Sequence, residues 1–195
     1  MAVRTETEGL RKKQIMQATR DVISEKGLDR TTMRDIGQRA GMSAAIVCYY
    51  FDDKKRLMKE TLLDASTSHR STLDAIINSS QPPLEKLDAA IRDSLPISGD
   101  QQREWRLWLD YWAEAARDPD LRAAISESEA RFRGFLESII REGAGDVFRS
   151  DIDPAQLAMA AVGILEGLAM AYIMDPLRVD LDTAISLVKR IVLPC

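Results

Sequence analysis

The segment from Met33 to Phe51 limits what this chain can fold into more than any other, because its residues are those of two short helices joined at a glycine. Gly37 lets the two helices cross closely, since it has no side chain at the crossing. Gly41 can adopt the left-handed conformation that a tight turn requires, and the Ser43 hydroxyl can cap the second helix. The pattern predicts a helix-turn-helix, with an ordinary αα-hairpin of a helical bundle as the alternative.

The residues that follow the second helix of this motif suit contacts with phosphate. Tyr49, Tyr50 and Phe51 close the helix, and Lys54 lies near the start of the next one. Phenolic hydroxyls and an ammonium donate hydrogen bonds to phosphate oxygens, and a helix N-terminus favours anions. These neighbours favour a nucleic-acid-binding motif over a hairpin that only fills a bundle.

The first fifty-odd residues resemble the N-terminal domain of TetR-family transcriptional repressors. The resemblance is carried by Thr31-Thr32, Gly41-Met42-Ser43, Tyr49-Tyr50-Phe51 and Lys54. The family commonly has Gly or Pro, then Thr, Leu and Tyr, where this chain has Ala45, Ile46, Val47 and Cys48. Apolar groups thus replace the hydroxyl contacts expected from that helix. This difference affects which base sequence the helix recognises, and not the way in which the helix binds DNA.

The resemblance also implies which residues contact DNA. Arg34 is expected at a guanine edge, with a solvated surface position as its alternative. Four residues of the second motif helix are expected in the groove: Ala44, Ala45, Ile46 and Cys48. Five residues are expected to hold phosphates: Thr32, Ser43, Tyr49, Tyr50 and Lys54.

The charge distribution agrees with a DNA-binding N-terminal part. The chain has a net charge of −4, but residues 1–60 hold 13 Lys and Arg against 9 Asp and Glu, a net of +4. A positive head on an acidic body would orient the molecule toward the duplex, since phosphate binding is largely electrostatic. An excess of four charges is modest and carries little weight alone.

The rest of the chain reads as helical, with no alternating strand pattern, so the fold class expected is all-α. We expect a helix-turn-helix DNA-binding domain over residues 1–55 and a helical ligand-binding and dimerisation domain over residues 56–195, with the fourth helix as the lever between them. Besides the two motif helices, the expected helices are Leu10–Lys26, Lys54–Asn78, Leu84–Leu95, Gln101–Arg117, Pro119–Glu142, Pro154–Met174 and Leu181–Val192.

All three tryptophans lie within the eight residues from Trp105 to Trp112. At about 100° per residue they share one face of a helix, which we expect to point inward. The alternatives are core filling and a cavity walled by indoles. This run and the Asp118-Pro119 break resemble the C-terminal domain of the BetI-type subgroup, whose best-known members answer to choline. Aromatic faces can hold a quaternary ammonium by about 0.5–2 kcal/mol per ring, so a ligand such as choline is permitted by the chemistry. The residues expected at the ligand are Trp105, Trp108, Tyr111, Trp112 and Glu166.

The segment Pro154–Met174 is almost wholly apolar, with Glu166 as its central exception. A transmembrane helix is disfavoured by this glutamate and by acidic residues at both ends. Gly163, Gly167 and Ala171 form a smooth strip at four-residue spacing, along which another helix can approach closely. We therefore expect this helix to pack against its copy in a homodimer, with Leu181–Val192 completing a four-helix interface.

These parts predict a cytoplasmic, ligand-responsive regulator, most simply a repressor, that binds an inverted-repeat operator as a homodimer and is released by a small-molecule inducer. A DNA-binding or architectural protein without an inducer is the alternative. An enzyme is disfavoured because His69 is the one histidine and no nucleophile, base or metal cluster is apparent. Cys48 and Cys195 show no metal or redox spacing. We expect no cofactor, no metal and no membrane partner.

Overall fold

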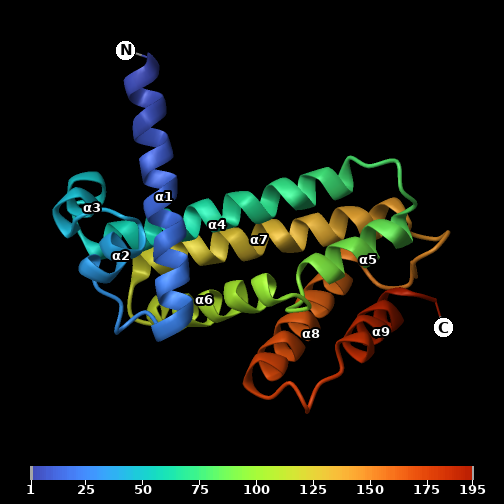
Figure 1. The fold of residues 1–195 in the computed structure, drawn as a ribbon. Coiled ribbons are helices and arrows are strands. Elements are labelled where there is room, and N and C mark those ends of the chain that lie inside the picture. Colours follow the sequence, from blue (N-terminus) through green and yellow to red (C-terminus); the bar gives the residue numbers. More distant parts are fainter. Residues whose placement is uncertain (1, 195) are drawn as a thin grey trace. The chain divides into compact units, whose positions relative to one another are not determined.

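The computed structural model of the protein describes residues 2–194, which form nine α-helices and no strand (Figure 1). An isolated bridge pairs Ala144 with Phe148. The helices are α1 (Ala2–Lys26), α2 (Met33–Arg39), α3 (Ala44–Phe51), α4 (Lys54–Ile77), α5 (Pro83–Asp93), α6 (Gly99–Ala115), α7 (Pro119–Glu142), α8 (Pro154–Met174) and α9 (Leu181–Val192). The all-α prediction is confirmed.

The helix bounds agree with the sequence expectation except at a few ends. The helix expected from Leu10 begins at Ala2 instead. No proline interrupts the polar stretch before Leu10, and Gly9 costs a helix interior only about 1 kcal/mol relative to alanine, so the helix continues through it. Helix α5 begins at Pro83 rather than Leu84, in the first turn where proline is tolerated.

The chain divides into two compact units. The first unit comprises the chain up to Thr67 together with Arg106–Arg122, and the second comprises Ser68–Trp105 together with the chain from Ala123 onward. Helices α4, α6 and α7 therefore each contribute to both units. The functional division predicted between residues 55 and 56 stays a prediction.

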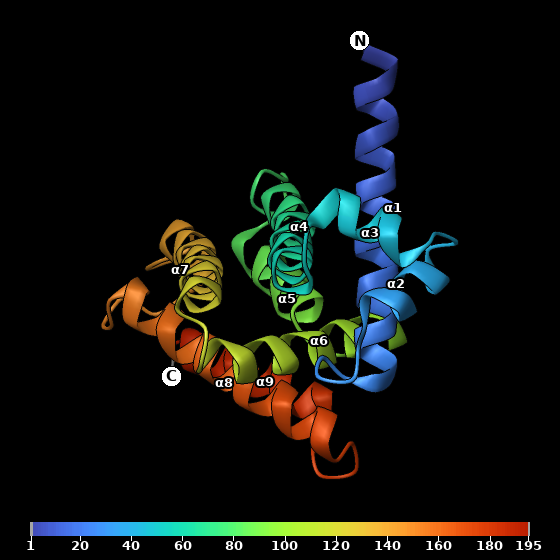
Figure 2. The ribbon, with the colours of Figure 1, turned by 90° about the vertical axis from the view of Figure 1, so that its left-hand side faces the viewer.

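The core of the first unit joins α1 to the helix-turn-helix, which lies beside it in both views (Figures 1 and 2). Its fully buried side chains are those of Ile15, Ile36, Val47, Phe51 and Leu57, each 0% exposed. They come from α1, α2, α3 and α4, so one hydrophobic cluster fixes the orientation of the motif within its unit.

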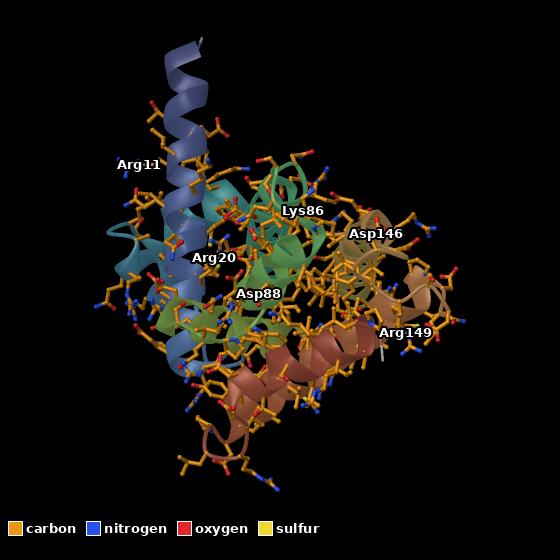
Figure 3. All side chains as sticks on the ribbon, turned by 90° about the vertical axis from the view of Figure 1, so that its right-hand side faces the viewer. Arg11, Arg20, Lys86, Asp88, Asp146 and Arg149 are labelled. Atoms are coloured by element: carbon orange, nitrogen blue, oxygen red, sulfur yellow. The ribbon has the colours of Figure 1, made fainter. Side chains whose placement is uncertain are left out.

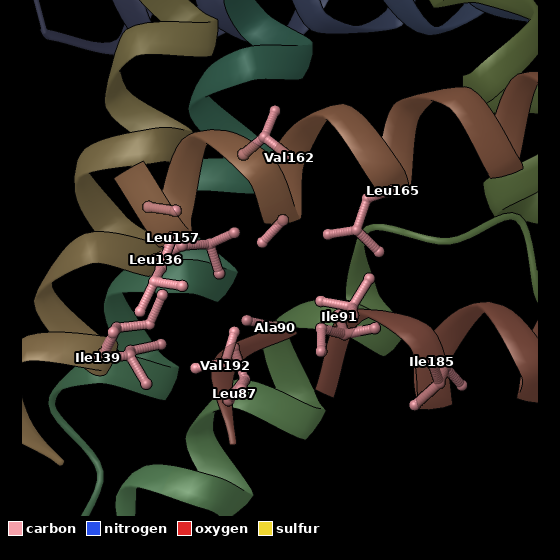
Figure 4. Packing of buried hydrophobic residues seen from close by; sticks show 14 of the residues in the cluster. Leu87, Ala90, Ile91, Leu136, Ile139, Leu157, Val162, Leu165, Ile185 and Val192 are labelled. Carbon is pink, nitrogen blue, oxygen red and sulfur yellow. The ribbon is translucent and has the colours of Figure 1, made fainter. Parts of the chain in front are cut away.

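The core of the second unit is formed by α5, α7, α8 and α9 (Figure 4). Leu87 and Ile91 of α5 belong to one buried cluster with Leu136 of α7, Leu165 of α8 and Val188 of α9. Truncating a large buried side chain of this kind typically lowers the stability of a protein by several kcal/mol. The cluster therefore holds these helices together.

Lys86 and Asp88 of α5, which are labelled in Figure 3, form ion pairs with other helices of the second unit. The Lys86 ammonium is buried and donates to both carboxylate oxygens of Glu142, at 2.9 and 3.0 Å. Asp88 pairs with Arg92 on its own helix and with Lys189 of α9. Helix α5 is thus tied to the end of α7 and to α9.

Candidate nucleic-acid interface and ligand site

Helix α2 begins with a complete capping box. The hydroxyl of Thr32 accepts a hydrogen bond from the Asp35 amide, and the Asp35 carboxylate accepts one from the Thr32 amide. Lys26 also pairs with Asp35 at 2.9 Å, and the Lys26 and Thr32 hydrogen bonds lower the pKa of Asp35 to about 2. Thr32 is exposed, so the predicted phosphate contact lies at a firmly capped helix start.

The turn between α2 and α3 leaves no room for a side chain at Gly37. A Cβ atom built there would lie 2.8 Å from the carbonyl oxygen of Met42. Gly41 has a φ of +67°, and Ser43 caps α3 by accepting from the Ile46 amide at 3.3 Å. The roles predicted for all three residues in the local structure are confirmed.

Helix α3 has one buried and one exposed face. Val47 and Phe51 are 0% exposed and anchor it to the core, whereas Ile46 and Tyr49 are 44% and 77% exposed. The remaining groove candidates are Ala44, which is half-buried, and Ala45 and Cys48, which are exposed. Large exposed apolar and aromatic side chains on so short a helix indicate a surface that meets a partner.

Helix α3 carries an aromatic pair, and cations lie on the neighbouring helices α1 and α2. The rings of Tyr49 and Tyr50 meet edge to face with centroids 5.3 Å apart. Lys12 lies over the Phe51 ring at 5.4 Å. Arg34 is exposed on α2.

Lys54 has a role that the sequence did not reveal. Its ammonium donates to the carbonyl oxygen of Leu28 at 2.7 Å, so it anchors the α1–α2 connection. An ammonium has three donors, so this contact leaves two for other acceptors. Its predicted phosphate contact stays a prediction.

The aromatic stripe of α6 is oriented differently from the sequence expectation. Leu107, Tyr111 and Ala115 are the buried residues, whereas the three indoles are half-buried. On a helical wheel the buried stripe is rotated by roughly 90° from the tryptophan arc. The reason is that the Tyr111 hydroxyl has a partner, the carbonyl oxygen of Met58 at 2.9 Å, so this side chain can be wholly buried.

The residues expected at a ligand are divided between the units. Trp108, Tyr111 and Trp112 belong to the first unit, where the rings of Trp108 and Trp112 lie 6.4 Å apart. Trp105 and Glu166 belong to the second, where the Trp105 indole donates to the Ser94 carbonyl oxygen at 2.9 Å. Their convergence on one ligand stays a prediction.

Glu166 is a half-buried carboxyl group on α8. Burial, and to a lesser degree the charge of Glu129, raise its pKa to about 7, although Arg133 opposes the shift. Both neighbours lie on α7, so Glu166 faces the α7 side of its helix. A nearby cation would stabilise the charged form of this carboxyl group and lower its raised pKa.

One face of α8 is apolar and exposed. Met159, Met170 and Met174 are 59%, 45% and 69% exposed, and a Cβ atom at Gly163 or Gly167 would meet nothing within 4 Å. Ala171, the third residue of the predicted strip, is half-buried. Within residues 2–194, α8 is also the one helix long and apolar enough to cross a bilayer, with a mean hydropathy of 1.9 and 33% of that stretch buried.

Two carboxylates that sequence reasoning did not assign contact the helix-turn-helix side of the first unit. Asp110 of α6 accepts a hydrogen bond from the Leu28 amide at 3.1 Å, and burial raises its pKa. Asp118, between α6 and α7, pairs with Lys55 at 3.0 Å. No local signal marks these contacts, because their partners are 82 and 63 positions away in the chain.

In the described part of the chain, no three His, Cys, Asp or Glu residues gather to hold a metal ion.

Comparison with known proteins agrees with this geometry. The family model for the N-terminal domain of bacterial regulatory proteins of the tetR family matches residues 15–61, and the model for the C-terminal domain of BetI-type transcriptional repressors matches residues 83–193. The chain is 26% identical to the HTH-type transcriptional regulator BetI of Cronobacter sakazakii, covering 94% of this chain and 89% of that protein. It is 25% identical to BetI of Escherichia coli K12, covering 95% and 93%.

Solved structures share the fold at lower identity. A transcriptional regulator from Saccharomonospora viridis, crystallised in complex with choline, matches with a TM-score of 0.87 at 22% identity, covering 94% of this chain and 98% of that one. A TetR transcription regulator from Haloarcula marismortui matches with a TM-score of 0.84 at 21% identity, covering 95% and 100%.

Proposed function

Because the chain belongs to the TetR family of bacterial regulatory proteins and carries a BetI-type C-terminal domain, we propose that it represses transcription as a homodimer and is released from DNA by a small molecule. Membership of this family makes the chain a DNA-binding transcriptional regulator and not an enzyme. In this proposal residues 1–55 read the DNA and residues 56–195 bind the ligand and dimerise. The protein acts in the cytoplasm, where its DNA is.

The exposed face of α3 is the observation that carries the DNA-binding mode. Val47 and Phe51 hold the helix from behind, so Ile46 and Tyr49 point away from the core. Arg34 is exposed on α2, the first helix of the same motif, which begins with a complete cap at Thr32. A short, anchored helix with exposed side chains fits the major groove, which is about 12 Å wide.

The exposed stripe of α8 supports a homodimer. Three exposed methionines around two open glycines form an apolar surface that a copy of the same helix would cover. A two-fold dimer presents two recognition helices to successive major grooves about 34 Å apart, so the operator is an inverted repeat.

The ligand we propose is a cation, with a quaternary ammonium such as choline as the first choice. Within the second unit, Glu166 supplies a carboxyl group whose ionised form a cation would stabilise, and the half-buried Trp105 supplies an aromatic face. The choline complex of the similar regulator supports the same choice. The ligand releases DNA by favouring a conformation in which the two recognition helices no longer match the operator.

Selection from a library of random DNA duplexes tests the DNA-binding part of the proposal. The wild-type protein is expected to enrich an inverted repeat, and Arg34→Ala is expected to bind the selected duplex about tenfold more weakly, with relaxed preference at one position of each half-site. Arg70→Ala removes an equal charge from an exposed position of the second unit and should bind within about twofold of wild type. Failure to enrich any sequence would contradict the proposal.

The carboxyl group of Glu166 makes a second prediction, about pH. Its pKa is raised to about 7 in the folded protein, so between about pH 4.5 and 7 the folded state binds more protons than the unfolded state. The stability contribution of this group is therefore lost as the pH rises through that range. Glu166→Gln should leave the melting temperature nearly unchanged at pH 5 and raise it at pH 8, as measured by circular dichroism.

Choline titrations at several pH values connect this group to the ligand. If choline lies beside Glu166, its affinity should increase between pH 6 and 8 as the carboxyl group ionises, and Glu166→Gln should remove this dependence. An affinity that is flat with pH in the wild-type protein, or unchanged by Glu166→Gln, would exclude Glu166 from the ligand site.

A further inference from the structure

The main chain of Leu28 is held at both of its polar groups. Its amide donates to the Asp110 carboxylate at 3.1 Å, and its carbonyl oxygen accepts from the Lys54 ammonium at 2.7 Å and from the Thr31 amide at 3.2 Å. Leu28 itself is 6% exposed. It therefore lies between α6 on one side and the start of α4 on the other, all within the first unit.

The position of Leu28 matters because the chain enters the helix-turn-helix directly after it. Gly27, with a φ of +79°, ends α1, and Thr32 caps α2 four residues after Leu28. The Thr31 hydroxyl bonds back to the Gly27 carbonyl oxygen at 2.8 Å, so the short connection has little freedom once Leu28 is fixed. Lys54, which shares the Leu28 carbonyl oxygen, opens the helix that follows α3.

The charge of Asp110 points to a geometric role. A negative charge in the unit that meets a polyanion lowers the affinity for DNA, and burial adds a desolvation cost. Asp110 is half-buried on α6 with Gly27 close to its carboxylate, which lies 3.9 Å from where a Gly27 Cβ would be. The interaction of the Asp110 carboxylate that offsets these costs is its hydrogen bond from the Leu28 amide.

We propose that Asp110 is a positioning residue for DNA binding, which acts through the main chain of Leu28 to fix the Lys54 ammonium and the entry into α2. This inference rests on the proposed function and adds a residue of α6 to the DNA-binding machinery. Tyr111 and Asp118 support the same attachment, since they bind Met58 and Lys55 of α4.

The test measures the affinity of variants for the duplex that the wild-type protein selects. Asp110→Ala should bind at least about tenfold more weakly, although loss of a negative charge alone would tighten binding. Asp110→Asn should stay within about threefold of wild type, because the amide oxygen still accepts from Leu28. Glu114→Ala removes the same charge one turn along α6 and should bind as well as wild type or better.

A double-mutant cycle shows whether the effect passes through Lys54. In a Lys54→Ala background, Asp110→Ala should weaken binding less than it does in the wild-type protein, since residues that act through one contact are not additive. The cost that remains comes from the entry into α2. Hydrogen exchange of the Leu28 amide gives a readout without DNA: it should be slow in wild type and Asp110→Asn, and fast in Asp110→Ala, with circular dichroism confirming that each variant is folded.

Several results would overturn the inference. They are Asp110→Ala binding as tightly as wild type, Asp110→Asn failing as badly as Asp110→Ala, additive costs in the cycle, and an unchanged Leu28 exchange rate. A wild-type protein that selects no duplex would remove the proposed function and this inference together, whereas a wild type that binds, with variants that bind equally, removes the inference alone.

Discussion

Replacing Gly163 by arginine is expected to make the protein monomeric and to weaken its binding to the selected duplex by about 100-fold or more. A Cβ atom at this position would meet nothing within 4 Å, and arginine favours a helix over glycine by up to about 1 kcal/mol. The monomer should therefore fold. In the proposed dimer, two symmetry-related arginines would be buried against each other, and buried unpaired charge costs several kcal/mol.

Analytical ultracentrifugation and fluorescence anisotropy measure the two effects. The matched control is Gly134→Arg on α7, where the glycine is equally open and the change in charge is the same. That variant should stay dimeric and bind DNA at least as well as wild type. A dimeric Gly163→Arg protein would show that α8 is not the interface.

Replacing Gly37 by alanine is expected to reduce DNA binding at least about tenfold and to lower the melting temperature. A methyl group there would lie 2.8 Å from the Met42 carbonyl oxygen and 3.1 Å from the Ala44 amide nitrogen, and both are backbone atoms that cannot turn aside. Crowding of this kind typically costs about 1–3 kcal/mol, and relieving it requires α3 to move from its anchored position.

The same substitution at Gly9 is the control. Gly9 lies in α1 with nothing within 4 Å of a Cβ atom, so Gly9→Ala should raise the melting temperature slightly through its helix propensity. Both variants are measured by circular dichroism and by anisotropy on the selected duplex. Equal behaviour of the two would mean that the crossing at Gly37 is not tight in solution.

The sequence predicts the local structure of the motif well because the determinants are local. The positive φ of Gly41, the cap at Ser43 and the ends of α7, α8 and α9 each depend on residues a few positions apart. Such short-range chemistry can be read directly from the order of residues.

The attachment of α6 could not be predicted in the same way. Tyr111 is buried because a carbonyl oxygen 53 positions earlier accepts its hydroxyl, and Asp110 has its place because of an amide 82 positions earlier. An argument from helical periodicity predicts that the face with the largest apolar residues is buried, and it therefore predicted that the tryptophans point inward. The contacts that decide the matter are tertiary, and no spacing rule contains them.

Crosslinking from Cys48 tests the central claim, that α3 enters the major groove, most directly. Cys48 is exposed on α3, so in a Cys195→Ser background it can carry a short photoreactive group on the face that we propose reads DNA. On the selected duplex, we expect crosslinks to bases at two positions related by the symmetry of the inverted repeat, one in each half-site. Absence of base crosslinks under conditions where the labelled protein still binds the duplex would contradict the account.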